Sequence, residues 1–230
     1  MCGRFTMIPR EVVERIVREV EAGLPIGEVT VPAQPEKPAS LFQASLFDAR
    51  ECGSPPAPAS RPAAGVDAFP GSRVPVVVPG GEPGHLAVAD LNWGYPVAWS
   101  KRPVFNTRVD TATGPRGDMW RESLAHRRCV VPTLGFYEPH RTVRVVSPKT
   151  GREIKAQCAF TLPEGPVTFL GGIYEDDHFS IMTCEPNRWV GDVHDRMPLV
   201  LRPAELDAWL GPRYAEMFDR RDVELACRLA

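Results

Sequence analysis

The stretch RCVVPTLGFYE, residues 128–138, predicts a β-strand because β-branched and aromatic residues are frequent in it. From residue 73 onward, similar runs recur between prolines and glycines, as is typical of all-β or mixed sheets. These runs are RVPVVV, PVFNTRV, TVRVVS, IKAQCAFTL, VTFLGGIYE and FSIMTCEP. Helices are expected at residues 9–22, 203–210 and 213–218. The pattern predicts one β-rich α+β domain over residues 1–230.

The first helix has the clearest signals. Pro9 suits a first helical turn, where its missing N–H costs nothing, and Gly23 suits the position just after the helix. Between them lies one apolar stripe, formed by Val12, Val13, Ile16, Val17 and Val20.

A proline- and alanine-rich segment interrupts the chain at about residues 32–72. Eight prolines and nine alanines fall within these 41 residues, and aromatic residues are few. Such a composition favours an extended loop or a partly disordered insertion. We do not treat it as a domain boundary, because the sequence before it is too short to fold alone.

Charge is distributed unevenly, although the whole chain carries only −2. Residues 101–152 contain eleven Lys/Arg and four Asp/Glu, a net +7, so the rest of the chain carries −9. This asymmetry predicts one positive face. Of the cations, 23 are arginine and 4 are lysine, and arginine suits bidentate contacts with phosphate.

The six cysteines lack zinc-site spacing, and a disulfide framework is not expected in a chain of this length without a secretory signal. We therefore expect neither a metal nor a cofactor. No run approaches the roughly 20 apolar residues that span a bilayer, and the N-terminus resembles no targeting signal. The expected protein is cytoplasmic and monomeric, without a membrane segment.

Cys2 is the residue with the most distinctive chemistry. Removal of Met1 would leave an α-amine and a thiol on one residue. The amine can form a Schiff base with an aldehyde, and the thiol can then close a thiazolidine ring. With reference pKa values near ~8 and ~8.5, both groups are expected to be partly reactive at neutral pH. Alternatively, Cys2 is an incidental residue of a frayed terminus.

Besides Cys2, the sequence contains a series of six motifs, the first of which includes Cys2. They are MCGRF (1–5), LNWGYP (91–96), FNTRVDTA (105–112), RCVVPTLGFYE (128–138), TCEPN (183–187) and VHDRMPLVL (193–201). In this order they resemble the SRAP family of SOS-response-associated peptidases, or abasic-site processing proteins. The resemblance implies a β-rich domain with an antiparallel, barrel-like sheet and a few flanking helices. It also implies a protein that crosslinks through Cys2 to the ring-opened sugar of an abasic site in single-stranded DNA, which shields the lesion from strand cleavage.

The resemblance assigns four catalytic residues. Cys2 is the nucleophile, exposed by a peptidase-like removal of Met1, and lyase-like activity is implied as well. Glu138 would move protons during Schiff-base formation, His194 would donate to the sugar O4′ during ring opening, and Asn106 would orient the amine. Without the motifs, these three residues would be interpreted as a surface carboxylate, a structural histidine and a turn-capping amide.

The DNA contacts that the resemblance implies are Arg4, Trp93, Gly94, Arg108, Thr183 and Arg196. The arginines would hold phosphates, Trp93 would stack on a base, and Gly94 would allow close approach. The alternatives are intramolecular ion pairs, such as Arg108 with Asp110, a core position for Trp93 and a turn cap for Thr183.

The chain departs from the family pattern at several positions. Pro139 replaces the tryptophan that commonly follows the catalytic glutamate, Asp110 replaces a glutamate, and the loop before Asn187 is altered. These changes put DNA affinity and strand preference in doubt. Two other functions stay open. An N-terminal-nucleophile glutamine amidohydrolase also begins with MCG and uses the thiol. A non-catalytic module would bind single-stranded DNA without a covalent product.

Overall fold

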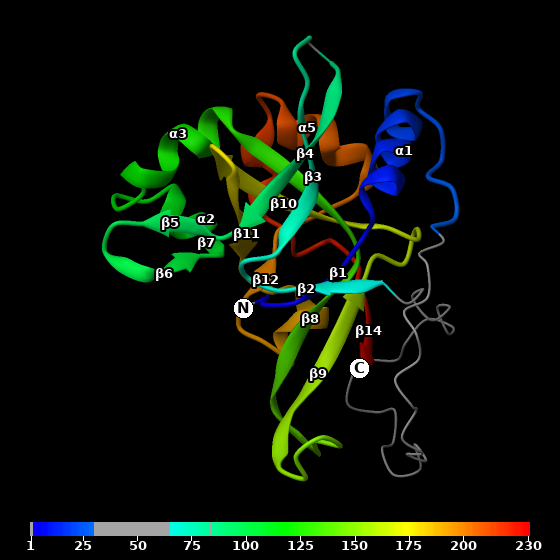
Figure 1. The fold of residues 1–230 in the computed structure, drawn as a ribbon, viewed down its shortest axis with the longest axis vertical. Coiled ribbons are helices and arrows are strands. Elements are labelled where there is room, and N and C mark those ends of the chain that lie inside the picture. Colours follow the sequence, from blue (N-terminus) through cyan, green and yellow to red (C-terminus); the bar gives the residue numbers. More distant parts are fainter. Residues whose placement is uncertain (1, 30–64, 83) are drawn as a thin grey trace.

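Strand β8 (Arg128–Val146) is the centre of the sheet in the computed structural model, which describes residues 2–29, 65–82 and 84–230 (Figure 1). It pairs in antiparallel fashion with β1 (Phe5–Met7), β3 (Arg73–Pro79), β9 (Glu153–Thr161) and β10 (Thr168–Glu175). These are four of twelve strands in the main sheet. The predicted β-rich α+β fold is confirmed.

A ring of strands makes the sheet close to a barrel, as expected. From β8 the ring passes through β3, β4 (Leu86–Trp93), β11 (His178–Cys184) and β10, and returns to β8. The sheet is mixed rather than purely antiparallel, because β11 runs parallel to both β4 and β7 (Asn106–Arg108). Further strands extend the ring, namely β2 (Val66–Ala68), β12 (Met197–Pro198), β13 (Val200–Leu201) and β14 (Ala226–Leu229).

Helices lie around one end of the ring, at the top of Figure 1. They are α1 (Arg10–Glu21), α3 (Asp118–His126) and α5 (Leu206–Leu210), with α2 (Val109–Ala112) beside α3. The helices and the sheet share one apolar cluster, which includes Ile16, Trp120 and Trp209. A second cluster joins Cys2 and Trp93 to strands β8 and β9.

The first helix forms as predicted. It begins after Pro9, buries Val13, Ile16 and Val17, and is followed by Gly23 with φ of +65°. A positive φ favours glycine, which explains the stop. Arg10 fixes the helix on the sheet through an ion pair with Asp90 of 2.9 Å.

Several elements differ from the expectations. The runs at 128–138 and 142–147 form one strand, β8, and PVFNTRV is divided between β6 (Ser100–Val104) and β7. Residues 203–210 form a 3₁₀ turn (Pro203–Glu205) before α5, and the helix expected at 213–218 is a 3₁₀ helix (Tyr214–Phe218). The sequence did not predict β4 or α3. Most of the 32–72 segment lies outside the described residues, but its end forms β2, which pairs with β1.

Among the described residues, no helix is long and apolar enough to cross a membrane. The same residues contain no group of three or more His, Cys, Asp or Glu side chains placed to hold a metal ion.

Candidate active site around Cys2

Cys2 is buried against the middle of β8. Strand β1 pairs Phe5 with Phe136, and the Tyr137 N–H donates to the Arg4 carbonyl at 3.0 Å. The Tyr137–Arg4 bond extends the pairing of β1 with β8 toward the start of the chain. Cys2 therefore lies against the sheet, and none of its surface is exposed to solvent. Asn106, at the start of β7, donates from Nδ2 to the Cys2 carbonyl at 2.7 Å. Cys2 is therefore a fixed residue and not a frayed one.

Glu138 lies on β8, two residues beyond Phe136, and its side chain is fully buried. Burial disfavours the charged carboxylate and raises the pKa of Glu138 to about 7. The Glu138 Oε2 atom lies 3.9 Å from Nε2 of His194. A carboxyl group with this pKa can both give and accept a proton near neutral pH.

His194 approaches Glu138 from the loop that follows α4 (Arg188–Gly191). Its Nδ1 lies 3.1 Å from the main-chain N and O of Arg196, which directs Nε2 at the carboxyl group. Burial lowers the pKa of His194 below 6.5, so the ring is mostly neutral at pH 7. Nδ1 also lies 3.0 Å from Oδ1 of Asp195, so it has both a donor and acceptors within hydrogen-bond distance. In the tautomer where Nδ1 accepts from the Arg196 N–H, the Nε2–H group can hydrogen-bond to a substrate oxygen.

Burial sets the protonation state of the Cys2 thiol. Burial is the main cause that raises its pKa far above the ordinary value, and the nearby charge of Glu138 adds to the effect. With Met1 still attached, the folded chain therefore keeps the thiol protonated at neutral pH; the partly ionised thiol expected of the free aminothiol stays a prediction for the form without Met1. The thiol is held as S–H, 3.6 Å from the Arg4 carbonyl oxygen.

The loop that carries His194 is anchored by Asn187, which the sequence analysis did not select for this role. The Asn187 Oδ1 accepts from the N–H groups of Trp189 and Val190, both at 3.1 Å, and Nδ2 donates to Val223 O at 2.7 Å. Asparagine before a helical turn is a familiar N-cap, so the TCEPN motif contained the signal.

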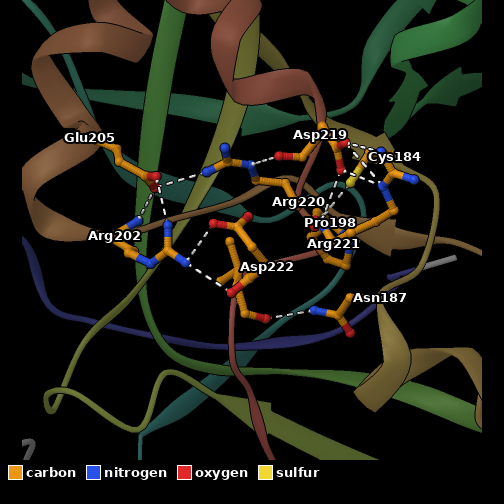
Figure 2. A network of polar contacts seen from close by, with 10 residues as sticks. Cys184, Asn187, Pro198, Arg202, Glu205, Asp219, Arg220, Arg221 and Asp222 are labelled. Carbon is orange, nitrogen blue, oxygen red and sulfur yellow. Dashed lines mark hydrogen bonds and ion pairs between the residues drawn. The ribbon is translucent and has the colours of Figure 1, made fainter.

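Figure 2 shows the polar network around the C-terminal segment to which Asn187 is hydrogen-bonded. Arg202 bonds to Glu205 and Asp222, and the buried Arg220 pairs with Glu205 at 2.8 Å. The network attaches the C-terminal segment that contains Val223 to the turn after β13. It therefore supports the Asn187 anchor and, through it, the position of His194.

The three arginines expected at DNA all have acidic partners. Arg4 pairs with Asp67 at 2.8 Å and lies over the Tyr137 ring. Arg108 and Arg196 both contact Asp110 at 2.8 Å. The alternative pairing of Arg108 with Asp110 is thus present. An ion pair does not exclude phosphate binding, since Arg108 keeps half of its side chain exposed.

Arg196 and Thr183 are hydrogen-bonded neighbours, and both are buried. Arg196 donates from Nη2 to the Thr183 carbonyl at 3.0 Å, while its buried Nε has no hydrogen-bond partner among the described residues. The Thr183 hydroxyl is fully buried and lies 3.4 Å from the Thr107 carbonyl oxygen, to which it donates. Arg196 has an available donor, whereas Thr183 does not face solvent in this conformation.

Trp93 occupies the core, which was the alternative interpretation of this residue. Its indole is fully buried between Phe5 and Phe179, and Nε1–H donates to the Phe105 carbonyl at 2.8 Å. No base can stack on it in this conformation. Gly94 has φ of +137°, and a Cβ there would lie 3.0 Å from Pro103, so glycine is needed for the backbone itself.

Trp99, which was not among the residues expected to contact DNA, is an exposed aromatic side chain three residues after the LNWGYP motif. It lies between β5 (Tyr95–Val97) and β6, with 69% of its surface exposed, and Lys101 and Arg102 follow on β6. An exposed tryptophan beside cations is suited to base stacking. The signal was present in the sequence as a tryptophan between turn-forming residues and Lys-Arg.

The fold and this cluster of side chains define a β-rich protein that buries the thiol of its second residue beside a glutamate and a histidine. Residues 1–225 match the family described as SOS response associated peptidase (SRAP). The chain belongs to the SRAP family, as the motifs predicted.

Named relatives match about half of the chain. It is 30% identical over 137 residues to the abasic site processing protein YoaM of Bacillus subtilis, covering 54% of this chain and 56% of YoaM. It is 32% identical over 127 residues to the abasic site processing protein YedK of Escherichia coli, covering 55% and 56%. The chain thus spans about half the length of these relatives.

A solved structure supports the fold over the full length. A protein from Bordetella bronchiseptica superposes with a TM-score of 0.59 at 16% identity, covering all of this chain and 99% of the other.

Proposed function

We propose that this protein processes abasic sites by a covalent bond between Cys2 and the ring-opened sugar in single-stranded DNA. The observation that carries the proposal is the convergence of Cys2, Asn106, Glu138 and His194 in one largely buried cluster. The names of relatives such as YoaM and YedK support the same lesion. Removal of the methionine before Cys2 supplies the reactive amine.

The first step is ring opening. The abasic sugar exists mainly as a cyclic hemiacetal, which opens when its C1 hydroxyl loses a proton and O4′ gains one. The carboxylate form of Glu138 can accept the hydroxyl proton, and the protonated fraction of His194 can donate to O4′ from Nε2, which points toward Glu138. Ring opening and the later bond formation thus occur at one place.

The second step joins the Cys2 amine to the aldehyde carbon. A carbinolamine forms first, and Glu138 in its protonated form donates the proton with which the hydroxyl leaves as water. Asn106 supports this role because its Nδ2 holds the Cys2 carbonyl, and its buried Oδ1 has no partner among the described residues. That oxygen can accept from the amine and direct the nitrogen lone pair at the aldehyde.

The third step closes the ring. The Cys2 sulfur adds to the carbon of the protonated imine, and the thiol proton passes to the Glu138 carboxylate left by the second step, so the product is a thiazolidine. The raised thiol pKa supports this order, because a protonated thiol leaves the amine to attack first. A thiol-first amidohydrolase needs an activated thiolate, which a buried thiol beside Glu138 does not provide.

The DNA-binding residues that we propose are Arg4, Arg108 and Arg196 for phosphates and Trp99 for a base. Gly94 and Thr183 would shape the backbone around the site, and Trp93 would support it from the core. In the free protein these three arginines pair with carboxylates. When DNA binds, each can exchange its carboxylate partner for a phosphate group. Pro139 stands where the family commonly has a tryptophan, so that stacking surface is missing. Trp99, three residues after the LNWGYP motif, is an exposed aromatic side chain that can take its place.

The test is intact mass after incubation with an oligonucleotide that contains one abasic site. We expect loss of Met1 and a denaturant-resistant adduct whose mass is the sum of the two partners less one water. Cys2→Ala should form only a Schiff base, which is stable after borohydride reduction and lost without it. A stable adduct of unreduced Cys2→Ala would overturn the mechanism, and glutaminase activity with no DNA adduct would overturn the function.

A further inference from the structure

The last strand of the chain brings two thiols together. β14 pairs with β9 in antiparallel fashion, with Cys227 opposite Phe160 and Leu229 opposite Cys158. Residues that lie opposite each other in such a ladder point to the same face of the sheet, and so do residues two apart on one strand. Cys158 and Cys227 are therefore diagonal neighbours on one face, and their thiol groups are hydrogen-bonded to each other.

This pair differs from the other buried thiols in its proton affinity. Burial raises the pKa of the Cys2, Cys129 and Cys184 thiols. The hydrogen bond with Cys227 instead lowers the pKa of Cys158 below its ordinary value, although burial opposes the effect. The thiolate is the nucleophilic form of cysteine. We therefore expect the pair to react with oxidants faster than the thiols that burial keeps protonated.

Cys227 gives the pair a route to solvent. Cys158 is fully buried, whereas Cys227 is only partly buried. β14 also lies at an edge of the sheet, because β9 is its only partner among the described strands. An accessible cysteine beside a second, resolving cysteine is the usual arrangement of a redox-sensitive thiol pair. An oxidant can thus meet Cys227 first, and Cys158 is in place to react next.

A hydroperoxide, ROOH, is the class of oxidant that suits this pair. The proton shared between the sulfurs can pass to Cys158, which leaves the thiolate at Cys227. That thiolate attacks one peroxide oxygen, the O–O bond breaks, and Cys227 becomes a sulfenic acid while RO⁻ takes a proton from water. The Cys158 sulfur then attacks the Cys227 sulfur, the S–O bond breaks, and the hydroxyl leaves as water with the Cys158 proton. Two thiols and ROOH thus give a disulfide, ROH and water.

Closing the disulfide would draw β14 toward β9. Diagonal neighbours in a sheet lie about 7–8 Å apart, whereas the Cα atoms of a disulfide usually lie about 4.4–6.8 Å apart. β9 is held by β8 on its other side, so β14 is the strand that can move. The disulfide therefore pulls on the chain that precedes Cys227.

That preceding segment holds the Asn187 anchor. Its other end is fixed by the network of Figure 2, in which the buried Arg220 is ion-paired. Val223, whose carbonyl accepts from Asn187 Nδ2 at 2.7 Å, lies between this network and Cys227. A shift of β14 is therefore transmitted to the Asn187 bond and, through the cap of α4, to His194.

We propose that Cys158 and Cys227 form a reversible disulfide when the protein meets a hydroperoxide, and that this disulfide slows the reaction at Cys2 by displacing the loop that carries His194. Formation of the disulfide is independent of the proposed function, whereas its effect on crosslinking rests on that function. Thiol reductants would restore the pair by exchange.

The first test detects the disulfide. Every protein carries Cys52→Ser, because Cys52 lies outside the described residues. Each is treated with hydrogen peroxide, its remaining thiols are alkylated, and peptides are mapped without reduction. We expect a peptide that joins Cys158 to Cys227 and that dithiothreitol separates. The matched control Cys129→Ala should form it to the same extent, and Cys227→Ser should not. Absence of the joined peptide from the folded parent would overturn the proposal.

The second test measures the rate of crosslinking to an abasic single strand before and after oxidation. For the parent we expect a rate about tenfold lower after oxidation, since displacement of a group by about 1 Å can cost up to about 100-fold. Dithiothreitol should restore the rate. Cys227→Ser should keep its rate after the same treatment, which separates the disulfide from oxidation of Cys2 itself.

Thermal unfolding checks that all variants fold. An unchanged rate in the oxidised parent would overturn the proposed switch, and so would an equal loss in Cys227→Ser. A reduced parent that forms no crosslink would overturn the proposed function instead, and the peptide map would still test the disulfide.

Discussion

Replacing the buried Glu138 by glutamine should make the protein more stable at alkaline pH. The pKa of Glu138 in the folded protein is about 7, against an ordinary value of 4.5, because burial disfavours the carboxylate. Between these pH values the folded protein binds more protons than the unfolded chain. The free energy of unfolding therefore falls as pH rises from about 4.5 to about 7 and stays low above that.

The magnitude follows from the difference of about 2.5 pKa units. At about 1.36 kcal/mol per unit, the ionised Glu138 costs the folded state about 3 kcal/mol at pH 8. Glu138→Gln has nearly the same shape and no charge, so it should gain this amount at pH 8 and almost nothing at pH 4. For a protein of this size, about 3 kcal/mol corresponds to a Tm increase of roughly 6–12 °C.

The assay is denaturant unfolding of both proteins at intervals from pH 4 to pH 8. The surface variant Glu164→Gln controls for loss of an exposed negative charge. A difference between Glu138→Gln and the parent that is independent of pH would refute the reasoning, and so would a less stable variant at pH 8. The same variant should lose crosslinking, because it can neither give nor accept the proton.

Four other predictions address the site and its surroundings. Asn187→Ala should lower the free energy of unfolding by about 2–4 kcal/mol in denaturant titrations, because it removes an N-cap and leaves the buried Val223 carbonyl without its donor. It should also change the pH dependence of crosslinking, whereas a loss of stability alone would leave that pH dependence unchanged. Trp99→Ala should weaken binding of single-stranded DNA by about 1–3 kcal/mol in fluorescence titrations and should leave the Tm unchanged. Trp99→Phe should retain most of the binding free energy. Trp93→Ala should instead cost about 3–5 kcal/mol of stability, since that side chain is fully buried; equal effects at the two tryptophans would contradict the assignment. Gly94→Ala should lower the Tm, because its φ of +137° and the contact with Pro103 leave no room for a Cβ.

Local patterns predicted much of the fold. The apolar stripe of α1, the glycine after it and the β-branched runs depend on short-range chemistry, and the structure has them where they were expected. The missed α3 has a mixed composition, and tertiary contacts of Trp120 and Leu124 stabilise it. The motifs also predicted the membership in the SRAP family over residues 1–225.

The site was only partly predictable. Motif order selected Cys2, Asn106, Glu138 and His194, but no local pattern could indicate how deeply they are buried. Burial is a sum over many residues from distant strands, and it raises the pKa of Glu138 and of the Cys2 thiol. For the same reason the complete burial of Trp93 could not be predicted from its neighbours in sequence.

The sequence by itself determined which chemical groups are available: an aminothiol once Met1 is removed, a carboxyl group, an imidazole and an excess of positive charge in residues 101–152. Only the tertiary structure decided which of these groups meet, which are covered and which stay exposed. The physical reason is that proton affinity and accessibility depend on the surrounding solvent and charges, and these are set by segments that are far apart along the chain.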